Sequence, residues 1–236
     1  MAKHVAIVLS AGRGTRMNTA VSKQYLLIQG KPVIYYSLQT FQKCPFIDEI
    51  VLVTGKTEMD YCRKEIVEKY HLDKVTKITA GGAQRYHSVY CGLQAISDCD
   101  YVYIHDGARP FVDKEILERA QKAVGTYGAC VVGMPVKDTI KISDDSGFAE
   151  STPDRSKVWQ IQTPQVFGFS LVKECYEKLM AELEEGKEIA VTDDAMVVEC
   201  ESDVKVRLVE GSYTNMKITT PEDLLLAEVF ASKKKE

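Results

Sequence analysis

Residues that could bind phosphate gather in a glycine-rich segment near the start of the chain. The segment runs from Val8 to Tyr25, follows a strand-length apolar run, and contains Arg13, Arg16 and Lys23. Backbone N–H groups in a glycine-rich turn after a strand can converge on phosphate oxygens, and nearby cations strengthen that attraction. The segment therefore predicts a site for a polyanion, most simply a nucleoside triphosphate.

Two familiar phosphate-binding motifs do not match this segment. A P-loop requires G-x-x-x-x-G-K-[ST], and no window of the segment has that spacing. The dinucleotide fingerprint G-x-G-x-x-G requires a third glycine, and Met17 stands at that position. The segment thus indicates a nucleotide site of another kind, and a tight turn with merely solvated charges is the alternative.

A second glycine turn, G-G-A-Q-R-Y-H-S, lies between an expected strand and an expected helix. Gly82 and Ala83 let a flat or anionic ligand approach the backbone closely. Arg85 and Ser88 are three residues apart, so they share one face at the start of the helix. Their donors suit a base edge or a phosphate, and a helix start with an exposed arginine is the alternative.

Asp106 follows the fourth expected strand in the motif H-D-G-A-R-P. Ligands of open α/β sheets bind at the carboxyl ends of strands, so Asp106 is placed to hold Mg²⁺ on bound phosphates. A surface pair with Arg109 is the alternative. No pair of residues has the pattern of a general acid–base dyad, which fits nucleotidyl transfer, where positioning and charge neutralisation do most of the catalysis.

The composition indicates an ordinary globular protein of 236 residues and 26.4 kDa, with a net charge of −4. An acidic balance argues against a nucleic-acid surface, and no apolar run approaches the roughly 18 residues that span a membrane. We identify no signal peptide, and seven cysteines without a C-x-x-C motif indicate reduced thiols. We therefore expect one cytoplasmic domain over residues 1–236 that binds neither nucleic acid nor membrane.

Short β-branched runs alternate with helix-length segments, which predicts an α/β fold: a Rossmann-like, mostly parallel sheet with helices on both faces. The pair Asp193 and Asp194 before an apolar segment is typical of a helix N-terminus. The expected strands are 5–9, 49–54, 75–79, 101–105, 129–134 and 204–209, and the expected helices are 33–43, 58–70, 84–96, 113–124, 170–185 and one that begins at Pro221.

The alternation stops between residues 135 and 167. Alternating residues at 139–142, turn residues at 144–147 and a return to Trp159 predict a protruding β-hairpin arm over residues 136–160. Because an isolated two-stranded ribbon is marginally stable in water, a second copy of the chain is the economical packing partner. We expect a homodimer formed through this arm, and the alternative is an arm that folds back on its own domain.

Polar residues on and after the arm could bind a second anion opposite the triphosphate. They are Lys137, Thr139, Arg155, Thr163 and, further along the chain, Lys217. Any one of them is more often a surface residue than a ligand.

Taken together and in order, the motifs resemble the 2-C-methyl-D-erythritol 4-phosphate cytidylyltransferase family. The resemblance rests on L-S-A-G-R-G-T-R-M, S-K-Q-Y, G-G-A-Q-R-Y-H-S-V, H-D-G-A-R-P-F, P-V-K-D-T-I-K, Q-T-P-Q-V-F, T-D-D-A and V-E-G-S-Y-T-N-M-K-I-T-T-P-E-D. It implies a nucleotidyltransferase-type fold and an enzyme that joins CTP and methylerythritol phosphate, giving CDP-methylerythritol and pyrophosphate in isoprenoid precursor synthesis. It also implies Mg²⁺ or another divalent cation, and a homodimer.

The resemblance assigns roles to individual residues. Arg16 and Lys23 match the cations that stabilise the charge building on the triphosphate, and Asp106 matches the metal-side aspartate. Arg155 and Lys217 match residues that orient the attacking phosphate. The nucleotide cradle and cytosine pocket would comprise Ala11, Gly12, Gly82, Ala83, Arg85 and Ser88, and the acceptor would be held by Thr139, Arg155, Thr163 and Lys217.

The chain departs from the family pattern at one of these positions. Family members often have Asp where Ala83 stands, so that side-chain contact is absent here. The hairpin residues would serve the site of the partner subunit, which would make each site composite. A ribitol-5-phosphate cytidylyltransferase is the nearest alternative, and a non-catalytic nucleotide-binding subunit is an alternative from another class.

Overall fold

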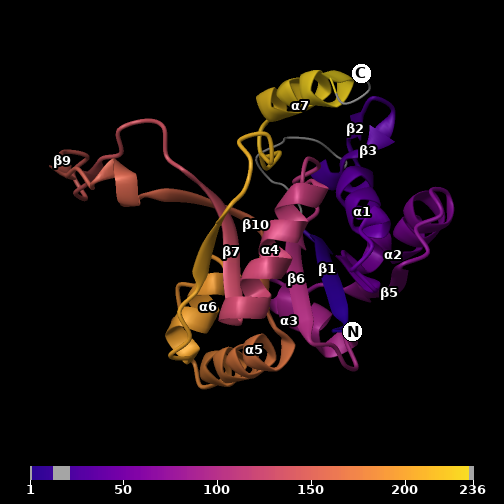
Figure 1. Cartoon of the computed structure of the whole chain (residues 1–236), viewed down its shortest axis with the longest axis horizontal. Helices are drawn as coiled ribbons and strands as arrows, with labels where there is room; N and C mark the ends of the chain where they lie inside the picture. The colour runs from indigo at the N-terminus through magenta and orange to yellow at the C-terminus, as the bar shows by residue number, and fades with distance from the viewer. Residues whose placement is uncertain (1, 13–21, 234–236) are drawn as a thin grey trace.

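The computed structural model describes residues 2–12 and 22–233, so Arg13 and Arg16 lie outside the described residues. Its centre is a seven-stranded sheet (Figure 1). In spatial order the strands are β11 (Arg207–Glu210), β7 (Ala129–Pro135), β10 (Trp159–Gly168), β6 (Tyr101–Asp106), β1 (His4–Ser10), β4 (Glu49–Thr54) and β5 (Val75–Ala80). Only β10 runs antiparallel to its neighbours in this sheet, which confirms the expected mostly parallel arrangement.

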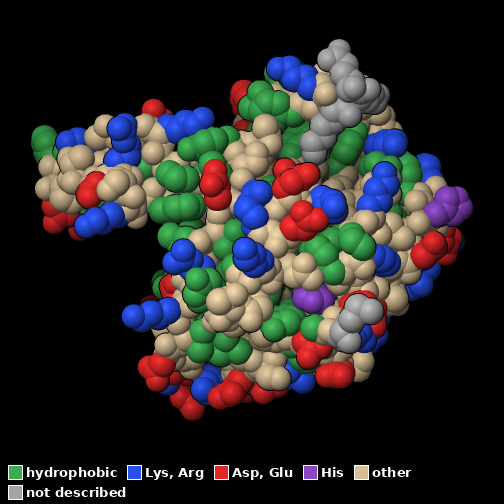
Figure 2. Space-filling view, viewed as in Figure 1, with side chains coloured by type: hydrophobic (Ala, Val, Ile, Leu, Met, Phe, Trp, Pro, Cys, Tyr) green, Lys and Arg blue, Asp and Glu red, His purple; other side chains and the backbone are tan. Residues whose placement is uncertain are grey.

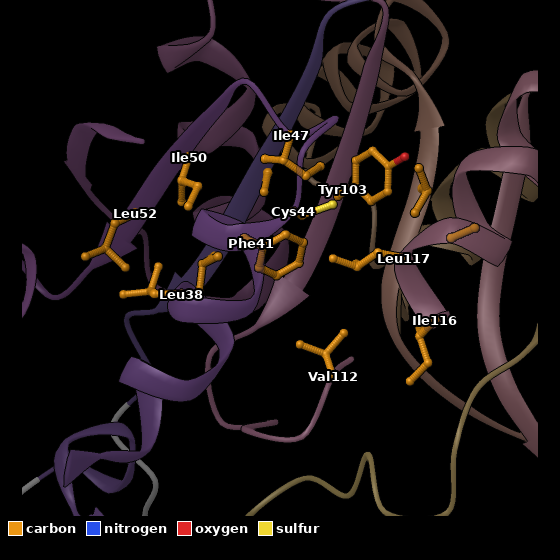
Figure 3. Close-up of a cluster of buried hydrophobic side chains, with 14 of the residues drawn as sticks. Leu38, Phe41, Cys44, Ile47, Ile50, Leu52, Tyr103, Val112, Ile116 and Leu117 are labelled. Carbon is orange, nitrogen blue, oxygen red and sulfur yellow. The ribbon is translucent and has the colours of Figure 1, made fainter. Parts of the chain in front are cut away.

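Alternating residues of each strand serve the two faces of this sheet. On β1, Ala6 and Val8 join one buried cluster, whereas Val5 and Ile7 join the other. The first cluster is shown in Figure 3 and includes side chains of α1 (Val33–Lys43) and α4 (Lys114–Tyr127). The second includes side chains of α3 (Arg85–Ala95), α5 (Phe169–Glu184) and α6 (Asp194–Glu201). Helices therefore cover both faces, as expected.

One expected helix has a different form. Instead of a continuous α-helix over residues 58–70, the chain forms η3 (Lys56–Glu58), a short α2 (Met59–Tyr61) and the π-helix η4 (Cys62–Glu68). Sequence periodicity does not separate these forms, because both bury side chains spaced about one turn apart. The expected strand at 204–209 begins later, at Arg207.

The strand β10 is the largest departure from expectation. The sequence predicted only a return of the arm near Trp159, but β10 continues for ten residues and lies between β7 and β6 in the sheet. Its polar residues Gln162, Thr163 and Gln165 are buried. These residues remove the apolar run that would have marked a central strand.

The segment between β7 and β10 extends away from the sheet (Figure 1). It contains β8 (Ile142–Ser143) and β9 (Ala149–Ser151), which pair antiparallel, and the turn η5 (Arg155–Lys157). Asp144 accepts hydrogen bonds from the backbone N–H groups of Ser146 and Phe148 at the tip. The dimerisation role of this segment stays a prediction.

The remaining elements lie around one end of the sheet. They are η2 (Lys23–Tyr25), β2 (Leu27–Ile28), β3 (Lys31–Pro32) and the final helix α7 (Pro221–Lys233). A small buried cluster, which includes Ile28, Phe111 and Ala227, joins β2 to α7. Among the described residues, no helix is both long and apolar enough to cross a membrane.

Candidate active site

A cavity of about 790 Å³ lies at the carboxyl ends of four neighbouring parallel strands. Residues that end or follow β1, β4, β5 and β6 line it, which is the usual position of ligands in open α/β sheets. Its volume is typical of a small-molecule site. Nine predicted site residues line the cavity: Ala11, Gly12, Lys23, Gly82, Ala83, Arg85, Ser88, Asp106 and Lys217.

The described lining of this cavity is strongly basic. It includes four cationic side chains, those of Lys23, Lys56, Arg85 and Lys217, against the single acidic side chain of Asp106. The whole chain carries a net charge of −4, so the positive charge is local. Such a concentration favours a polyanion. Lys56 was not predicted, although its position two residues after the end of β4 could have indicated it.

The two residues that follow Lys23 in the η2 turn fix its position at the cavity wall. Gln24 donates from Nε2 to the carbonyl oxygens of Ser10, at 2.5 Å, and Gly12, at 2.9 Å. The Tyr25 hydroxyl lies 3.0 Å from the Ser10 hydroxyl and 2.8 Å from the Thr54 hydroxyl. Burial raises the pKa of Tyr25, so its hydroxyl stays protonated. These bonds join the turn to the ends of β1 and β4.

The second glycine turn is shaped by close contacts. A Cβ on Gly81 would lie 2.5 Å from the Cβ of Ala11 and 2.6 Å from the Ser88 Oγ, and one on Gly82 would overlap His87. The Ser88 hydroxyl accepts from the Gly82 N–H and donates to the Gln84 carbonyl, both at 3.2 Å. Ser88 therefore holds the turn in place, and the exposed backbone of Gly82 and Ala83 lines the cavity.

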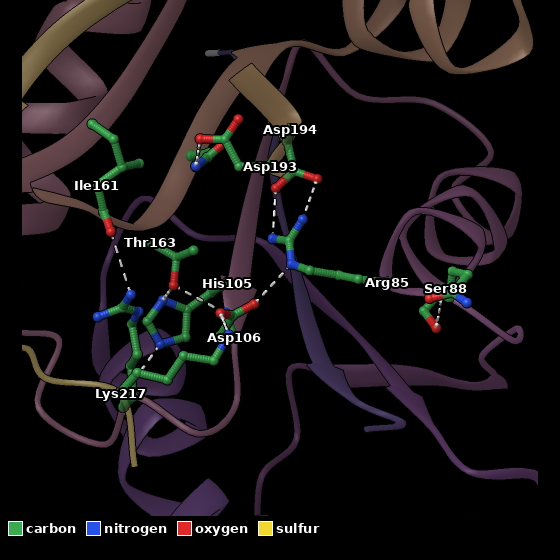
Figure 4. Close-up of polar contacts among 12 residues, drawn as sticks. Arg85, Ser88, His105, Asp106, Ile161, Thr163, Asp193, Asp194 and Lys217 are labelled. Atoms are coloured by element: carbon green, nitrogen blue, oxygen red, sulfur yellow. Dashed lines mark hydrogen bonds and ion pairs between the residues drawn. The ribbon is translucent and has the colours of Figure 1, made fainter. Parts of the chain in front are cut away.

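Asp106 is held by cations at both carboxylate oxygens (Figure 4). The Arg85 Nε donates to Oδ1 at 3.2 Å, and the Lys217 Nζ donates to Oδ2 at 2.7 Å. Burial alone would raise the pKa of this carboxyl, but the charges of Arg85, Lys217 and Arg109 outweigh burial and hold it well below its usual range. Asp106 is thus ionised throughout the physiological pH range.

Arg85 is more fully engaged than the sequence predicted. Its two terminal nitrogens donate to Asp194 at 2.8 and 2.7 Å, while Nε faces Asp106. The sequence indicated Asp194 most simply as part of a helix start, with a metal role as the secondary interpretation. That prediction is confirmed at Asp193, which accepts from the Met196 N–H at 2.9 Å and caps α6. The motif T-D-D-A was the only sequence signal for the contact with Arg85.

Thr163 is buried next to Asp106 and does not line the cavity. Its hydroxyl accepts from the Asp106 N–H at 3.0 Å and lies 3.1 Å from His105 Nδ1. The carbonyl of Arg109, 3.1 Å from His105 Nε2, can only accept, so Nε2 carries the proton and Nδ1 accepts from Thr163. Thr163 therefore supports Asp106 through its backbone.

His105 is expected to make stability depend on pH. Burial is the main cause that lowers its pKa from 6.5 to about 4. The unfolded state takes up the proton near pH 6.5 and the native state near pH 4, so stability is full above this window and falls as the pH decreases through it. The expected loss is about 3 kcal/mol of unfolding free energy. Urea unfolding of the wild type and of His105→Asn between pH 7 and pH 4 tests this expectation. The unfolding free energy of the variant should lack the decrease with falling pH that His105 causes in the wild type.

Two predicted acceptor residues lie on the projecting segment. Thr139 and Arg155 are exposed and do not line the cavity of their own chain. Arg155 donates from Nη1 to the Lys137 carbonyl at 3.0 Å. The structure thus separates these residues from the cavity, and their role stays a prediction.

The residues present fit Mg²⁺ that arrives with phosphates. Asp106 offers one ionised carboxylate at the cavity, with 11% of its side chain exposed. Within residues 2–12 and 22–233, no three His, Cys, Asp or Glu side chains cluster as a protein-only metal site. Mg²⁺ is commonly held by one or two carboxylates together with substrate phosphates and water. Asp106 therefore suits it, whereas a structural zinc site has no such support.

The family model described as 2-C-methyl-D-erythritol 4-phosphate cytidylyltransferase matches residues 4–233 of the chain. The chain belongs to this family. A relative of that name from Clostridium kluyveri is 46% identical over 97% of this chain and 96% of its own length. Another relative of that name, from Caldanaerobacter subterraneus subsp. tengcongensis, is 49% identical over 97% of this chain and 98% of its own length.

A solved structure supports the same assignment. The 4-diphosphocytidyl-2C-methyl-D-erythritol synthase from Anaerococcus prevotii has a TM-score of 0.85 at 35% identity, covering 98% of this chain and 96% of that chain. Membership of the cytidylyltransferase family makes the chain an enzyme of the nucleotidyltransferase class. A non-catalytic subunit is thereby set aside.

Proposed function

We propose that the basic cavity holds CTP and that the chain joins it to 2-C-methyl-D-erythritol 4-phosphate in isoprenoid precursor synthesis. The products are CDP-methylerythritol and pyrophosphate. The observation that carries this proposal is the set of four cationic side chains that line one cavity with a single carboxylate, at the strand ends of a chain from this family. Such a concentration of positive charge favours a triphosphate.

The reaction requires two polyanions to meet. A 4-phosphate oxygen of the acceptor attacks the α-phosphorus of CTP in line, and pyrophosphate leaves with the electron pair of the broken bond. Lys23, with Arg16, stabilises the charge on the leaving group. Lys217 lies beside Asp106 at the cavity and orients the incoming phosphate, since uncompensated repulsion would keep two phosphates apart.

Mg²⁺ belongs to this proposal as a partner of the triphosphate. When bound, it neutralises phosphate charge and polarises the phosphoryl oxygens. Asp106 would hold it from the protein side. The fixed position of Asp106, between Arg85 and Lys217, then defines where the triphosphate sits in the cavity.

The projecting segment, residues 136–160, is the proposed dimerisation element of a single cytoplasmic domain. Figure 2 shows a patch of hydrophobic surface at the tip of this segment. Within the segment, the side chains of Phe148 and Ile142 are 73% and 49% exposed. Exposed large apolar groups on a thin ribbon favour an interface. In such a dimer, Thr139 and Arg155 would enter the cavity of the partner, which would explain their distance from the cavity of their own chain.

Acceptor choice is tested by offering two polyol phosphates separately. The protein is incubated with CTP and Mg²⁺, and pyrophosphate release is measured with methylerythritol phosphate and with ribitol 5-phosphate. We expect efficient release only with methylerythritol phosphate. Equal or better turnover of ribitol 5-phosphate would assign the chain to the alternative activity, and release with neither acceptor would refute the proposed reaction.

Arg155→Ala is expected to impair acceptor use selectively. The KM for methylerythritol phosphate should rise by about 10-fold or more, because one charge-assisted contact to its phosphate is lost. The KM for CTP should stay within about twofold, since the role proposed for Arg155 is a contact with the acceptor phosphate and not with CTP. Lys157→Ala on the same exposed turn is the matched control. Equal effects on both substrates would contradict the role given to Arg155.

A further inference from the structure

We propose that Asp194 is a positioning residue for the transfer reaction: its buried carboxylate fixes Arg85 in the orientation from which Arg85 supports Asp106. The inference rests on the proposed function of the cavity. Asp194 has no other role in the proposed transfer reaction. Asp194 is 109 residues from Arg85 in the chain, and the fold brings them together.

The bonding pattern of Arg85 leaves it one orientation. Both terminal nitrogens donate to Asp194 in two nearly parallel bonds of 2.8 and 2.7 Å, so only Nε is directed to Asp106, at 3.2 Å. A guanidinium held by two such bonds has little rotational freedom. Figure 4 shows Arg85 reaching between the two carboxylates. The position of Asp194 therefore fixes the Arg85 guanidinium, and the guanidinium in turn fixes the side chain of Asp106.

The carboxylates of Asp194 and Asp106 differ in their exposure to the cavity. The side chain of Asp194 is fully buried, whereas those of Arg85 and Asp106 are 29% and 11% exposed. Asp106 lines the cavity and Asp194 does not. Asp194 thus acts on the reaction only through Arg85.

A second donor holds Asp194 from behind. The Tyr176 hydroxyl on α5 donates to Asp194 Oδ1 at 2.6 Å. The adjacent N-terminus of α6 is fixed by Gln165 on β10, whose side-chain oxygen accepts from the Ala195 N–H at 2.7 Å. Elements α3, α5 and α6 therefore converge on the end of β6, and Asp194 is where they meet.

Charge explains why this support matters. Arg85 pairs with two carboxylates, and Asp194 accepts its two shorter bonds. A neutral side chain at position 194 would leave Asp106 to balance the guanidinium, which would then turn toward Asp106 or toward the triphosphate. The Asp194 carboxylate therefore keeps the guanidinium in its present orientation.

The test is Asp194→Asn, which keeps the size of the side chain and removes its charge. We expect kcat to fall by about 10²-fold because Asp106 loses its fixed position, while the KM for CTP changes by less than about threefold. Asp193→Asn is the matched control, since asparagine also caps helices well and Asp193 does not contact Arg85. Its kcat should stay within about twofold of wild type.

Two further variants separate positioning from general stability. In an Arg85→Met background, Asp194→Asn should have no further effect on kcat, because the group that it positions is gone, whereas a purely structural role would give additive losses. Tyr176→Phe should lower kcat by about 3- to 10-fold with little change in the KM for CTP. If Asp194→Asn does not fold, Tyr176→Phe tests the proposal in its place, because a lower kcat with an unchanged KM for CTP is again the expected result.

The outcomes distinguish this inference from the proposed function. Wild-type turnover of CTP together with wild-type kcat in folded Asp194→Asn, or additive losses in the Arg85→Met background, would overturn the role of Asp194 alone. Absence of turnover in the wild type with either acceptor would instead refute the proposed function.

Discussion

Replacing Lys23 by alanine is expected to lower kcat for pyrophosphate release by about 10²- to 10³-fold. The η2 turn holds Lys23 at the cavity wall, because the buried side chains of Gln24 and Tyr25 form hydrogen bonds at the ends of β1 and β4. A cation fixed there would stabilise the leaving pyrophosphate without reorganising during the reaction. The loss should fall mainly on kcat, because charge on the leaving group is greatest in the transition state.

The measurement is steady-state pyrophosphate release with both substrates varied. Lys122→Ala, on the exposed side of α4 and away from the cavity, is the matched control and should retain wild-type activity. Thermal unfolding should change little in either variant, since surface lysines contribute little to stability. A folded Lys23→Ala enzyme with a turnover near that of the wild type would contradict the role assigned to this lysine.

Asp106→Asn is expected to have a comparable effect on kcat, about 10²- to 10³-fold. The variant removes the only described carboxylate in the cavity lining, which is also the proposed protein ligand of Mg²⁺. It leaves the Lys217 ammonium without its partner at 2.7 Å. Substrate phosphates would then meet a cavity with more positive charge but no fixed anion to define the position of the metal.

The loss of stability in Asp106→Asn should be smaller than the loss of a fully buried ion pair would suggest. Arg85 keeps Asp194, and the Lys217 side chain is 37% exposed, so solvent compensates part of its charge. We expect about 1–3 kcal/mol in urea unfolding at pH 7. An enzyme with near wild-type kcat but a large loss of stability would show that Asp106 is a structural residue.

Much of the framework could be predicted because its signals are local. The run Val5–Leu9 and the other apolar β-branched runs mark strands, and the glycine turns that follow two of them mark the cavity. Helix α1 has the expected limits, Val33 to Lys43. Strand ends in a parallel sheet meet at one edge, so motifs distant in sequence were expected to form one site, and nine of the predicted residues line one cavity.

The rest depends on tertiary contacts that no local pattern records. Strand β10 was missed because Gln162, Thr163 and Gln165 are polar yet buried through side-chain hydrogen bonds. The role of Thr163 in binding the acceptor stays a prediction, and its hydrogen bonds with the Asp106 N–H and His105 were not indicated by any local pattern. Hydropathy and motif spacing identify residue types and cannot show which partner satisfies a buried polar group.

The central claim is that each site combines the cavity of one chain with the projecting segment of a second. Lys23→Ala and Arg155→Ala chains are mixed in equal amounts under conditions that exchange subunits, and are assayed with methylerythritol phosphate well below the wild-type KM, where each chain alone has low activity. A mixed dimer has one site with both changes and one with neither, so random mixing should restore about one quarter of wild-type turnover. A mixture with no more activity than its two parents, although mixed dimers have formed, would contradict the claim.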